Sequence, residues 1–235
     1  MSPLDPQPAL VLFDLDDTLC DYGGARGGRL RIAFELAEQT SGRQLTAPID
    51  TVVAESIQLH PHGVDHFPDL LARYGIRDAN AIDAAVSWYL HHRFHGLQLF
   101  PDAIETLETV RAGRRDRRLG MVTNGPADVQ SAKIDLLGLR PYFDFCLISG
   151  EYGFWKPDRE IFQEALELGS SRPRDAVMIG DSPEHDIAGA EAAGLLTIWI
   201  DRTARSWPAE LEAPTRVAAD LHDVRRLLGN KSGAR

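Results

Sequence analysis

Short apolar runs without alternation constrain the fold of this 235-residue chain most strongly. Residues 9–13 are all apolar, which is typical of a strand buried on both faces of a parallel sheet. Comparable runs follow at residues 119–122, 145–148, 176–179 and 195–200. Helical patterns lie between them at residues 102–112, 126–137, 158–168 and 184–193. This alternation predicts an α/β fold with a doubly wound, Rossmann-like parallel sheet and helices on both faces.

One long stretch breaks this rhythm because it contains helical patterns and no buried-strand run. The helical patterns cover residues 30–38, 52–59 and 81–94. We therefore expect residues 1–22 and 97–235 to form the Rossmann-like catalytic core, with residues 23–96 inserted as a helical cap subdomain. The glycine-rich residues 23–28 lack the glycine order of a phosphate-binding turn, so we expect a flexible connector there.

Composition and charge exclude several classes of protein. Hydrophobic residues make up 43% of the chain, which allows a globular core. The net charge of −10 disfavours broad binding to nucleic acid. The two cysteines, Cys20 and Cys146, are far apart and predict reduced thiols. Asp14 interrupts the first apolar run too early for a membrane span, so we expect a cytoplasmic protein without a membrane partner. The sequence does not indicate an oligomeric state.

Polar or charged side chains follow four of the predicted strands, at the point where each strand ends. In chain order they are Asp14 and Asp16, Thr123 and Asn124, Lys156, and finally Asp181 and Asp186. Ligands of open parallel sheets bind beyond the carboxyl ends of the strands. We therefore expect these side chains to surround one site.

Several aspartates in one pocket repel one another, so either their pKa values rise or a cation compensates their charge. Oxygen ligands without His or Cys favour a hard ion such as Mg²⁺. Lys156 adds a positive charge, and the Thr123 hydroxyl and the backbone N–H groups of Asn124 and Gly125 are candidate donors to a phosphoryl oxygen. This set is typical of phosphoryl transfer through a carboxylate nucleophile.

At these four strand ends the sequence resembles the haloacid dehalogenase superfamily, in its phosphatase branches. The matching segments are Asp14-x-Asp16-x-Thr18-Leu19, Thr123-Asn124-Gly125, Lys156-Pro157-Asp158, and Gly180-Asp181-Ser182 with Asp186. The resemblance covers residues 9–200, with the helical insertion after the first segment. A second similarity, to the branch with nucleotide and acyl-sugar-acid phosphatases, runs through Thr123-Asn124-Gly125, Gln130, Lys133, Gly138-Leu139 and Tyr142-Phe143-Asp144.

The resemblance implies a role for each matching side chain. Asp14 would attack phosphorus and form an aspartyl-phosphate. Asp16 would protonate the leaving oxygen and then take a proton from the hydrolytic water. Thr123, Asn124 and Lys156 would bind the phosphoryl group, and Lys156 would also steady the nucleophile.

The resemblance also implies a Mg²⁺ site. Its ligands would be the Asp14 carboxylate, the Asp16 backbone carbonyl and Asp181. Asp186 would act behind them, through water or through Lys156. The ion would shield the attacking carboxylate from an anionic substrate.

The implied function is a Mg²⁺-dependent phosphatase for a small phosphomonoester, of the nucleotide or sugar phosphate type. An acid at Asp16 favours a phosphatase over a dehalogenase, because an alkoxide needs a proton to leave and a halide does not. A phosphomutase or phosphotransferase would use the same residues with another acceptor. A catalytically silent phosphate-binding module is the alternative from another class.

Three further features carry more than one interpretation. Arg26 and Arg29 either meet a second anionic group of the substrate or are exposed to solvent. Trp155 either shapes the mouth of the pocket or packs, and we expect packing. The arginine-rich residues 111–118 are expected to form a solvated helix end and loop rather than a nucleic-acid patch.

Overall fold

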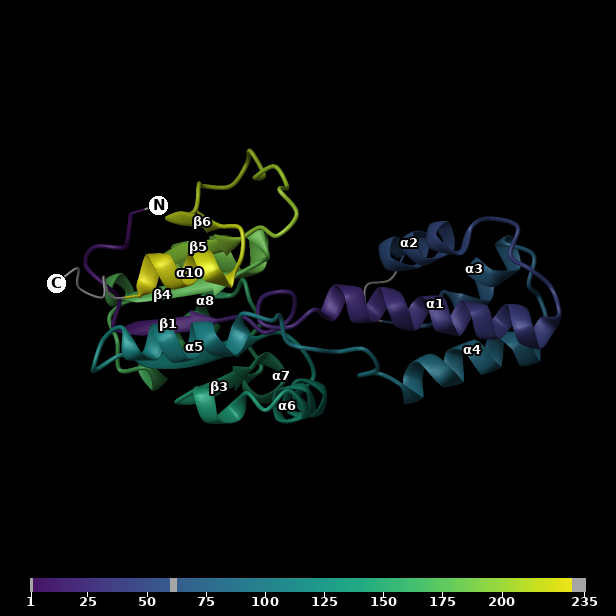
Figure 1. Cartoon of the computed structure of the whole chain (residues 1–235), viewed down its shortest axis with the longest axis horizontal. Helices are drawn as coiled ribbons and strands as arrows, with labels where there is room; N and C mark the ends of the chain where they lie inside the picture. The colour runs from purple at the N-terminus through teal and green to yellow at the C-terminus, as the bar shows by residue number, and fades with distance from the viewer. Residues whose placement is uncertain (1, 60–62, 230–235) are drawn as a thin grey trace. The chain divides into compact units, whose positions relative to one another are not determined.

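The computed structural model describes residues 2–59 and 63–229 of the chain (Figure 1). The chain divides into two compact units. The first combines Met1–Cys20 with Leu99–Arg235, and the second is Asp21–Gln98. None of the helices within the described ranges is long and apolar enough to cross a membrane.

The first unit is built around a parallel sheet whose strands have the order β3-β2-β1-β4-β5-β6. Its strands are β1 (Leu10–Phe13), β2 (Arg118–Thr123), β3 (Phe145–Ile148), β4 (Ala176–Gly180), β5 (Leu196–Ile200) and β6 (Arg216–Ala218). The prediction of a Rossmann-like parallel sheet is confirmed. The apolar runs did not indicate β6, because this edge strand has three residues, and one of them, Val217, is 41% exposed.

Helices cover both faces of this sheet (Figure 1). On one face, α5 (Ala103–Ala112) packs against α10 (Leu221–Leu228), and on the other α8 (Arg159–Leu168) packs against α9 (Gly189–Ala192). The remaining helical elements are α6 (Ala127–Leu136), η1 (Arg140–Tyr142), α7 (Ser149–Tyr152), η2 (Pro173–Asp175) and the π-helix η3 (Pro183–Ala188). The helix predicted over residues 184–193 is therefore divided between η3 and α9.

The central strand β1 is buried on both faces, which explains its unbroken apolar sequence. Leu10 and Leu12 pack into the cluster formed with α8 and α9, and the alternate residues Val11 and Phe13 point to the opposite face. All four are at most 1% exposed. The neighbouring Gly120 of β2 leaves room for this packing, because a Cβ there would lie 2.4 Å from the Phe145 ring.

In its described residues, 21–59 and 63–98, the second unit contains four helices with a hydrophobic core of their own. They are α1 (Tyr22–Ser41), α2 (Ile49–Leu59), α3 (Phe67–Arg73) and α4 (Ala79–His91). Helix α1 packs along α4 and α2. Edge-to-face contacts join Phe34 to Phe67 at 5.0 Å and Phe67 to Tyr89 at 5.5 Å between ring centres.

The prediction of a flexible connector at residues 23–28 is wrong, because these residues form the first turns of α1. The Asp21 carboxylate caps the helix by accepting a hydrogen bond from the Gly24 N–H at 2.8 Å. The buried side chains of Ala25 and Leu30 anchor the same segment. Capping and burial together offset the low helix propensity of glycine.

Solvent exposure of Arg26 and Arg29 is also not observed, since the two residues are 8% and 4% exposed. The Arg29 guanidinium lies 5.5 Å from the ring centre of Tyr22 and 5.3 Å from that of Tyr89. Aromatic rings of the same unit therefore enclose this cation.

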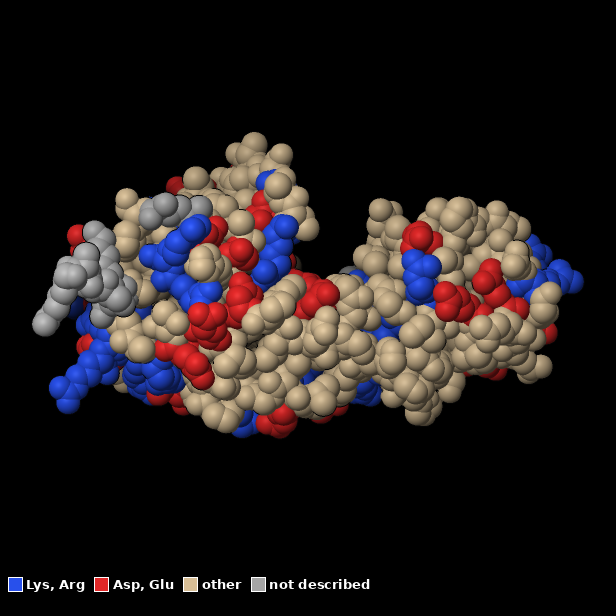
Figure 2. Space-filling model, in the orientation of Figure 1, with Lys and Arg blue, Asp and Glu red and all other residues tan. Residues whose placement is uncertain are grey.

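The arginine-rich segment at residues 111–118 is only partly solvated. Arg117 is 3% exposed, and its guanidinium donates to the main-chain oxygens of Pro8, Val110 and Leu228. This arginine joins the N-terminal segment, α5 and α10, so it has a structural role. On the face of the molecule in Figure 2, Lys and Arg side chains of the first unit are interspersed with Asp and Glu.

Alanine substitutions test the helical state of the glycine segment. Gly27 and Gly28 have open space where a Cβ would stand, so Gly27→Ala and Gly28→Ala should each raise the free energy of unfolding by up to about 1 kcal/mol. Gly24→Ala should lower it, because the new Cβ would lie 2.3 Å from Asp21 Oδ2 and 2.6 Å from Oδ1, the capping oxygen. Urea denaturation measures all three. No effect at Gly27 and Gly28 would contradict a helix at these residues.

Candidate active site

Asp14 lies directly after β1, at the carboxyl edge of the sheet. Its backbone N–H donates to the Ile179 carbonyl of β4 at 2.9 Å, which extends the strand pairing by one residue. The residue is 6% exposed. The two central strands therefore hold the Asp14 carboxylate at the position where ligands of such sheets bind.

Lys156 reaches this carboxylate from the loop after β3. Its ammonium lies 2.5 Å from Asp14 Oδ1 and 2.6 Å from Asp186 Oδ1. Burial lowers the pKa of Lys156, but the two carboxylates outweigh it and raise the pKa above its ordinary value. The lysine is therefore a charged, 4% exposed link between two aspartates.

Asn124 holds the backbone of Lys156 in place. Its side-chain amide donates to the Lys156 carbonyl at 2.8 Å, and its side-chain oxygen accepts from the Lys156 N–H at 2.9 Å. Both polar atoms of the Asn124 side chain are thus engaged with the Lys156 backbone. Binding of phosphate by the Asn124 backbone N–H stays a prediction.

The prediction that the Gly125 backbone N–H donates to a phosphoryl oxygen is wrong. Its N–H donates to the Ser149 hydroxyl at 2.9 Å, and its carbonyl accepts from the Gly150 N–H at 3.1 Å. These bonds join the β2 loop to α7, so the Gly125 N–H is occupied within the protein.

Asp186 of η3 is buried close to Asp14. While its Oδ1 accepts from Lys156, its Oδ2 accepts from the Ser182 N–H at 3.0 Å. A Cβ at Gly180 would lie 2.2 Å from this second oxygen. Glycine at this strand end therefore makes room for the Asp186 carboxylate.

Asp181 follows β4 and completes a cluster of three carboxylates. Its backbone carbonyl accepts from the Trp199 indole and from the Arg205 guanidinium, both at 2.9 Å. Its side chain is 26% exposed. These two donors from β5 and the following loop fix the position of Asp181.

Among the described residues, Asp14, Asp181 and Asp186 form a cluster that could hold a metal ion, with one oxygen of each within 4.8 Å of the others. Burial raises the pKa of Asp14 well above its usual range, against the effect of Lys156. Burial and Asp186 raise the pKa of Asp181 to about 7. Three carboxylates face one ammonium, so the cluster favours a proton or an added cation. Oxygen donors alone suit a hard divalent ion.

Asp16 belongs to a second group of contacts, with residues of α6. Its carboxylate oxygens lie 2.9 and 2.7 Å from the Lys133 ammonium. The Gln130 side-chain amide donates to Asp16 Oδ2 at 3.1 Å and to the Thr123 hydroxyl at 2.6 Å. Gln130 and Lys133 are 1% and 4% exposed.

Gln130 therefore connects the predicted site residues Asp16 and Thr123, and Lys133 holds Asp16. Gln130 and Lys133 were named in a sequence similarity, but no role was assigned to them. The available signal was their spacing of three residues in a helix that follows the second strand end, because such a spacing places both on one helix face.

Trp155 does not pack as predicted, because it is 43% exposed. Tyr152, the last residue of α7, and Phe154 in the loop that follows are 38% and 40% exposed. Three aromatic side chains thus reach solvent in the segment that leads to Lys156.

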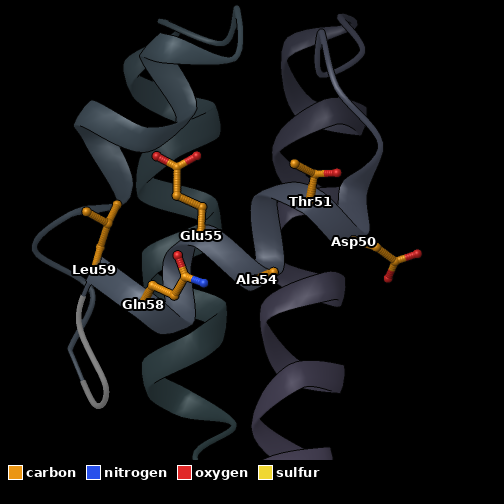
Figure 3. A pocket seen from close by; sticks show the side chains of 6 residues that line it. All are labelled: Asp50, Thr51, Ala54, Glu55, Gln58 and Leu59. Atoms are coloured by element: carbon orange, nitrogen blue, oxygen red, sulfur yellow. The ribbon is translucent and has the colours of Figure 1, made fainter.

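A pocket in the helical unit offers different chemistry (Figure 3). The described residues that line it come from α2: Asp50, Thr51, Ala54, Glu55, Gln58 and Leu59. Arg31 pairs with Asp50, and Arg73 pairs with Glu55. Among the described residues, the lining therefore contains two paired acids and no basic side chain, which is unfavourable for a phosphate group.

Comparison with known proteins gives matches over most of the chain. The family model of the haloacid dehalogenase-like hydrolases matches residues 8–194. A glyceraldehyde 3-phosphate phosphatase of Methanopyrus kandleri is 37% identical over 199 residues, or 82% of this chain and 83% of that protein. A ribulose-1,5-bisphosphate 5-phosphatase of Halopiger xanaduensis is 42% identical over 211 residues, or 83% of this chain and 86% of that protein.

A solved structure gives a similar result. The HAD-hydrolase YfnB of Bacillus subtilis, bound to magnesium, matches with a TM-score of 0.74 and 26% sequence identity. The match covers 94% of this chain and 99% of that chain. The similarity therefore extends over nearly the full length of both chains.

The raised pKa of Asp181 predicts a pH-dependent stability of the metal-free protein. The Asp181 carboxyl has a pKa of about 7 in the folded protein and about 4 in the unfolded chain. Its stronger binding of a proton in the folded state stabilises the fold, and this contribution is complete below pH 4. That contribution is lost as the pH rises through 7. Asp181→Asn in EDTA should therefore raise the free energy of unfolding at pH 8 by on the order of 1 kcal/mol, and less at pH 5. An equal effect at both pH values in urea denaturation would contradict this prediction.

Gly180→Ala tests the room left for Asp186. The new Cβ would meet a carboxylate that Lys156 and Ser182 hold on both sides, so the variant should unfold about 1–3 kcal/mol more easily. Thermal denaturation measures the change, and Gly28→Ala, at an open helical position, is the control. Equal melting temperatures for wild type and Gly180→Ala would show that Asp186 can move aside freely.

Proposed function

Because the chain belongs to the haloacid dehalogenase-like hydrolases, we propose that it is a Mg²⁺-dependent phosphatase that hydrolyses a small phosphomonoester through an aspartyl-phosphate. One observation carries this proposal. The Asp14 carboxylate lies at the carboxyl edge of the sheet, held by a buried ammonium and beside two further carboxylates.

In the proposed reaction Asp14 is the nucleophile. One of its oxygens forms a bond to phosphorus while the bond from phosphorus to the ester oxygen breaks, and Asp16 gives the departing oxygen a proton. Water then attacks the phosphorus of the aspartyl-phosphate and gives a proton to Asp16. This second step releases inorganic phosphate and restores the Asp14 carboxylate.

Lys156 and Thr123 would bind the phosphoryl oxygens in both steps. The Lys156 ammonium is already fixed beside Asp14 by Asn124 and Asp186, so it needs little reorganisation when a phosphate arrives. Its charge also lowers the repulsion between the attacking carboxylate and the anionic substrate.

The residues proposed to hold Mg²⁺ are Asp14, Asp181 and the backbone carbonyl of Asp16. Both oxygens of Asp186 already accept hydrogen bonds, which supports a role through Lys156 rather than as a direct ligand. When bound, the ion would neutralise negative charge on the nucleophile and the phosphoryl group.

Asp16 supports a phosphatase rather than a dehalogenase. An alkoxide leaving group needs a proton donor, which a departing halide does not. Asp16 follows the nucleophile by two residues in the same loop, and its carboxylate lies in hydrogen-bonding contact with the network around Thr123.

We infer a small phosphorylated substrate of the sugar phosphate or nucleotide type. Two similar proteins are named as phosphatases of glyceraldehyde 3-phosphate and ribulose-1,5-bisphosphate. In this proposal the inserted helical unit is the cap that selects the leaving group. Its two connections to the core lie next to Cys20 and Leu99, whose backbones form an isolated β-bridge. A second β-bridge joins Cys20 to Asp16.

Turnover of a panel of phosphomonoesters tests this function. We expect release of inorganic phosphate from sugar phosphates, nucleoside monophosphates or p-nitrophenyl phosphate, with loss of activity in EDTA and recovery with Mg²⁺. Asp14→Asn should lower kcat by at least about 10⁴-fold, because it removes the nucleophile. Acid quenching with ³²P-labelled substrate should trap an acyl-phosphate on Asp14 in the wild type alone.

Three outcomes would contradict the proposal. Full activity of Asp14→Asn would exclude the nucleophile. Isomerised sugar phosphate without free phosphate would identify a phosphomutase. Binding of phosphate without turnover of any ester would identify a silent binding module.

A further inference from the structure

We propose that Lys133 and Gln130 of α6 are positioning residues that hold Asp16 and Thr123 in the geometry for proton transfer to the leaving group. This inference rests on the proposed phosphatase function and concerns how its acid is oriented. It follows from contacts between side chains that the sequence places far apart.

The Lys133 ammonium is the first part of this arrangement. It lies within 2.9 Å of both carboxylate oxygens of Asp16, and its side chain is 5% exposed against 24% for Asp16. A buried ammonium is costly unless a paired charge compensates it, so the pair strongly favours one orientation of both side chains. Lys133 thereby restricts the rotation of the more exposed Asp16.

The Gln130 amide is the second part. The ionised carboxylate of Asp16 accepts hydrogen bonds and donates none, so the side-chain nitrogen of Gln130 must face it. The same nitrogen donates to the Thr123 hydroxyl, which leaves the hydroxyl hydrogen of Thr123 to donate to another acceptor. Gln130 thus orients the proposed phosphate ligand and the proposed acid together.

These contacts have a consequence for the two steps of the reaction. The contacts with Lys133 and Gln130 fix the orientation of the Asp16 side chain, which accepts a proton from water in the second step. The same restraint keeps the side chain beside Thr123 when it carries the proton for the first step. A catalytic group held near its reacting position loses less entropy in the transition state.

The proposal predicts a loss that depends on the leaving group. An alkoxide departs only with a proton, whereas p-nitrophenolate departs readily without one. Lys133→Met keeps the length of the side chain and removes its charge. It should lower kcat/KM about 100-fold for the best alkyl phosphate of the panel but less than about 5-fold for p-nitrophenyl phosphate.

A double-mutant cycle shows whether Lys133 acts through Asp16. In the Asp16→Asn background, Lys133→Met should change kcat/KM by less than about 2-fold, because the group that it positions is already inactive. Lys133→Arg, which restores the charge, should recover part of the activity on the alkyl ester. Gln130→Met should show the same dependence on the leaving group. It provides the test if Lys133→Met does not fold.

Asp135→Asn is the matched control. It removes an exposed ion pair between Asp135 of the same helix and Arg140 of η1, so it should leave kcat/KM for both esters unchanged. Thermal denaturation of each variant separates loss of folding from loss of positioning. Equal losses on both esters, or additive losses in the Asp16→Asn background, would overturn the proposal.

The outcomes also separate this inference from the proposed function. If the wild type is active and Lys133→Met behaves like the control, the positioning role is wrong and the phosphatase function stands. If the wild type turns over no phosphomonoester, both are wrong.

Discussion

The ion pairs of Lys156 with Asp14 and Asp186 are the interaction on which the rest of the core depends. Burial opposes every charge in this group, so each aspartate needs the ammonium and the ammonium needs both aspartates. The surrounding residues serve this arrangement: Asn124 fixes the backbone of Lys156, and Gly180 leaves space for Asp186. The carboxylates still outnumber the ammonium, so the cluster of Asp14, Asp181 and Asp186 could also hold a divalent cation.

A second buried lysine repeats this arrangement on the neighbouring aspartate of the same loop. Lys156 pairs with Asp14, and Lys133 pairs with Asp16, although the two lysines come from different elements. Each pair stabilises one carboxylate in a defined orientation. In the proposed mechanism this separates the nucleophile from the acid, because each has its own cation and its own set of hydrogen bonds.

Local patterns predicted the sheet and the edge at which the site lies, but they failed where a residue depends on distant partners. β6 is too short and exposed for an apolar run, and the glycines of α1 are helical because Asp21 caps them and Ala25 is buried. The arginine-rich segment that contains Arg117 was expected to be solvated, and solvent exposure was one of two interpretations of Arg29. Their burial depends on the rings of Tyr22 and Tyr89 in one case, and on three main-chain oxygens in the other.

The sequence by itself determined the central parallel strands and the carboxylates, hydroxyl and ammonium at their ends. It could do so because fully apolar runs indicate buried strands, and parallel strands bring their carboxyl ends to one edge. Only the tertiary structure decided that Asn124 holds Lys156, that the Gly125 N–H is occupied and that Lys133 and Gln130 hold Asp16. Lys133 and Asp16 are 117 residues apart in the chain, so their pairing depends on how α6 packs beside the loop after β1. A pattern of neighbouring residues does not show which residues far apart in the chain come into contact.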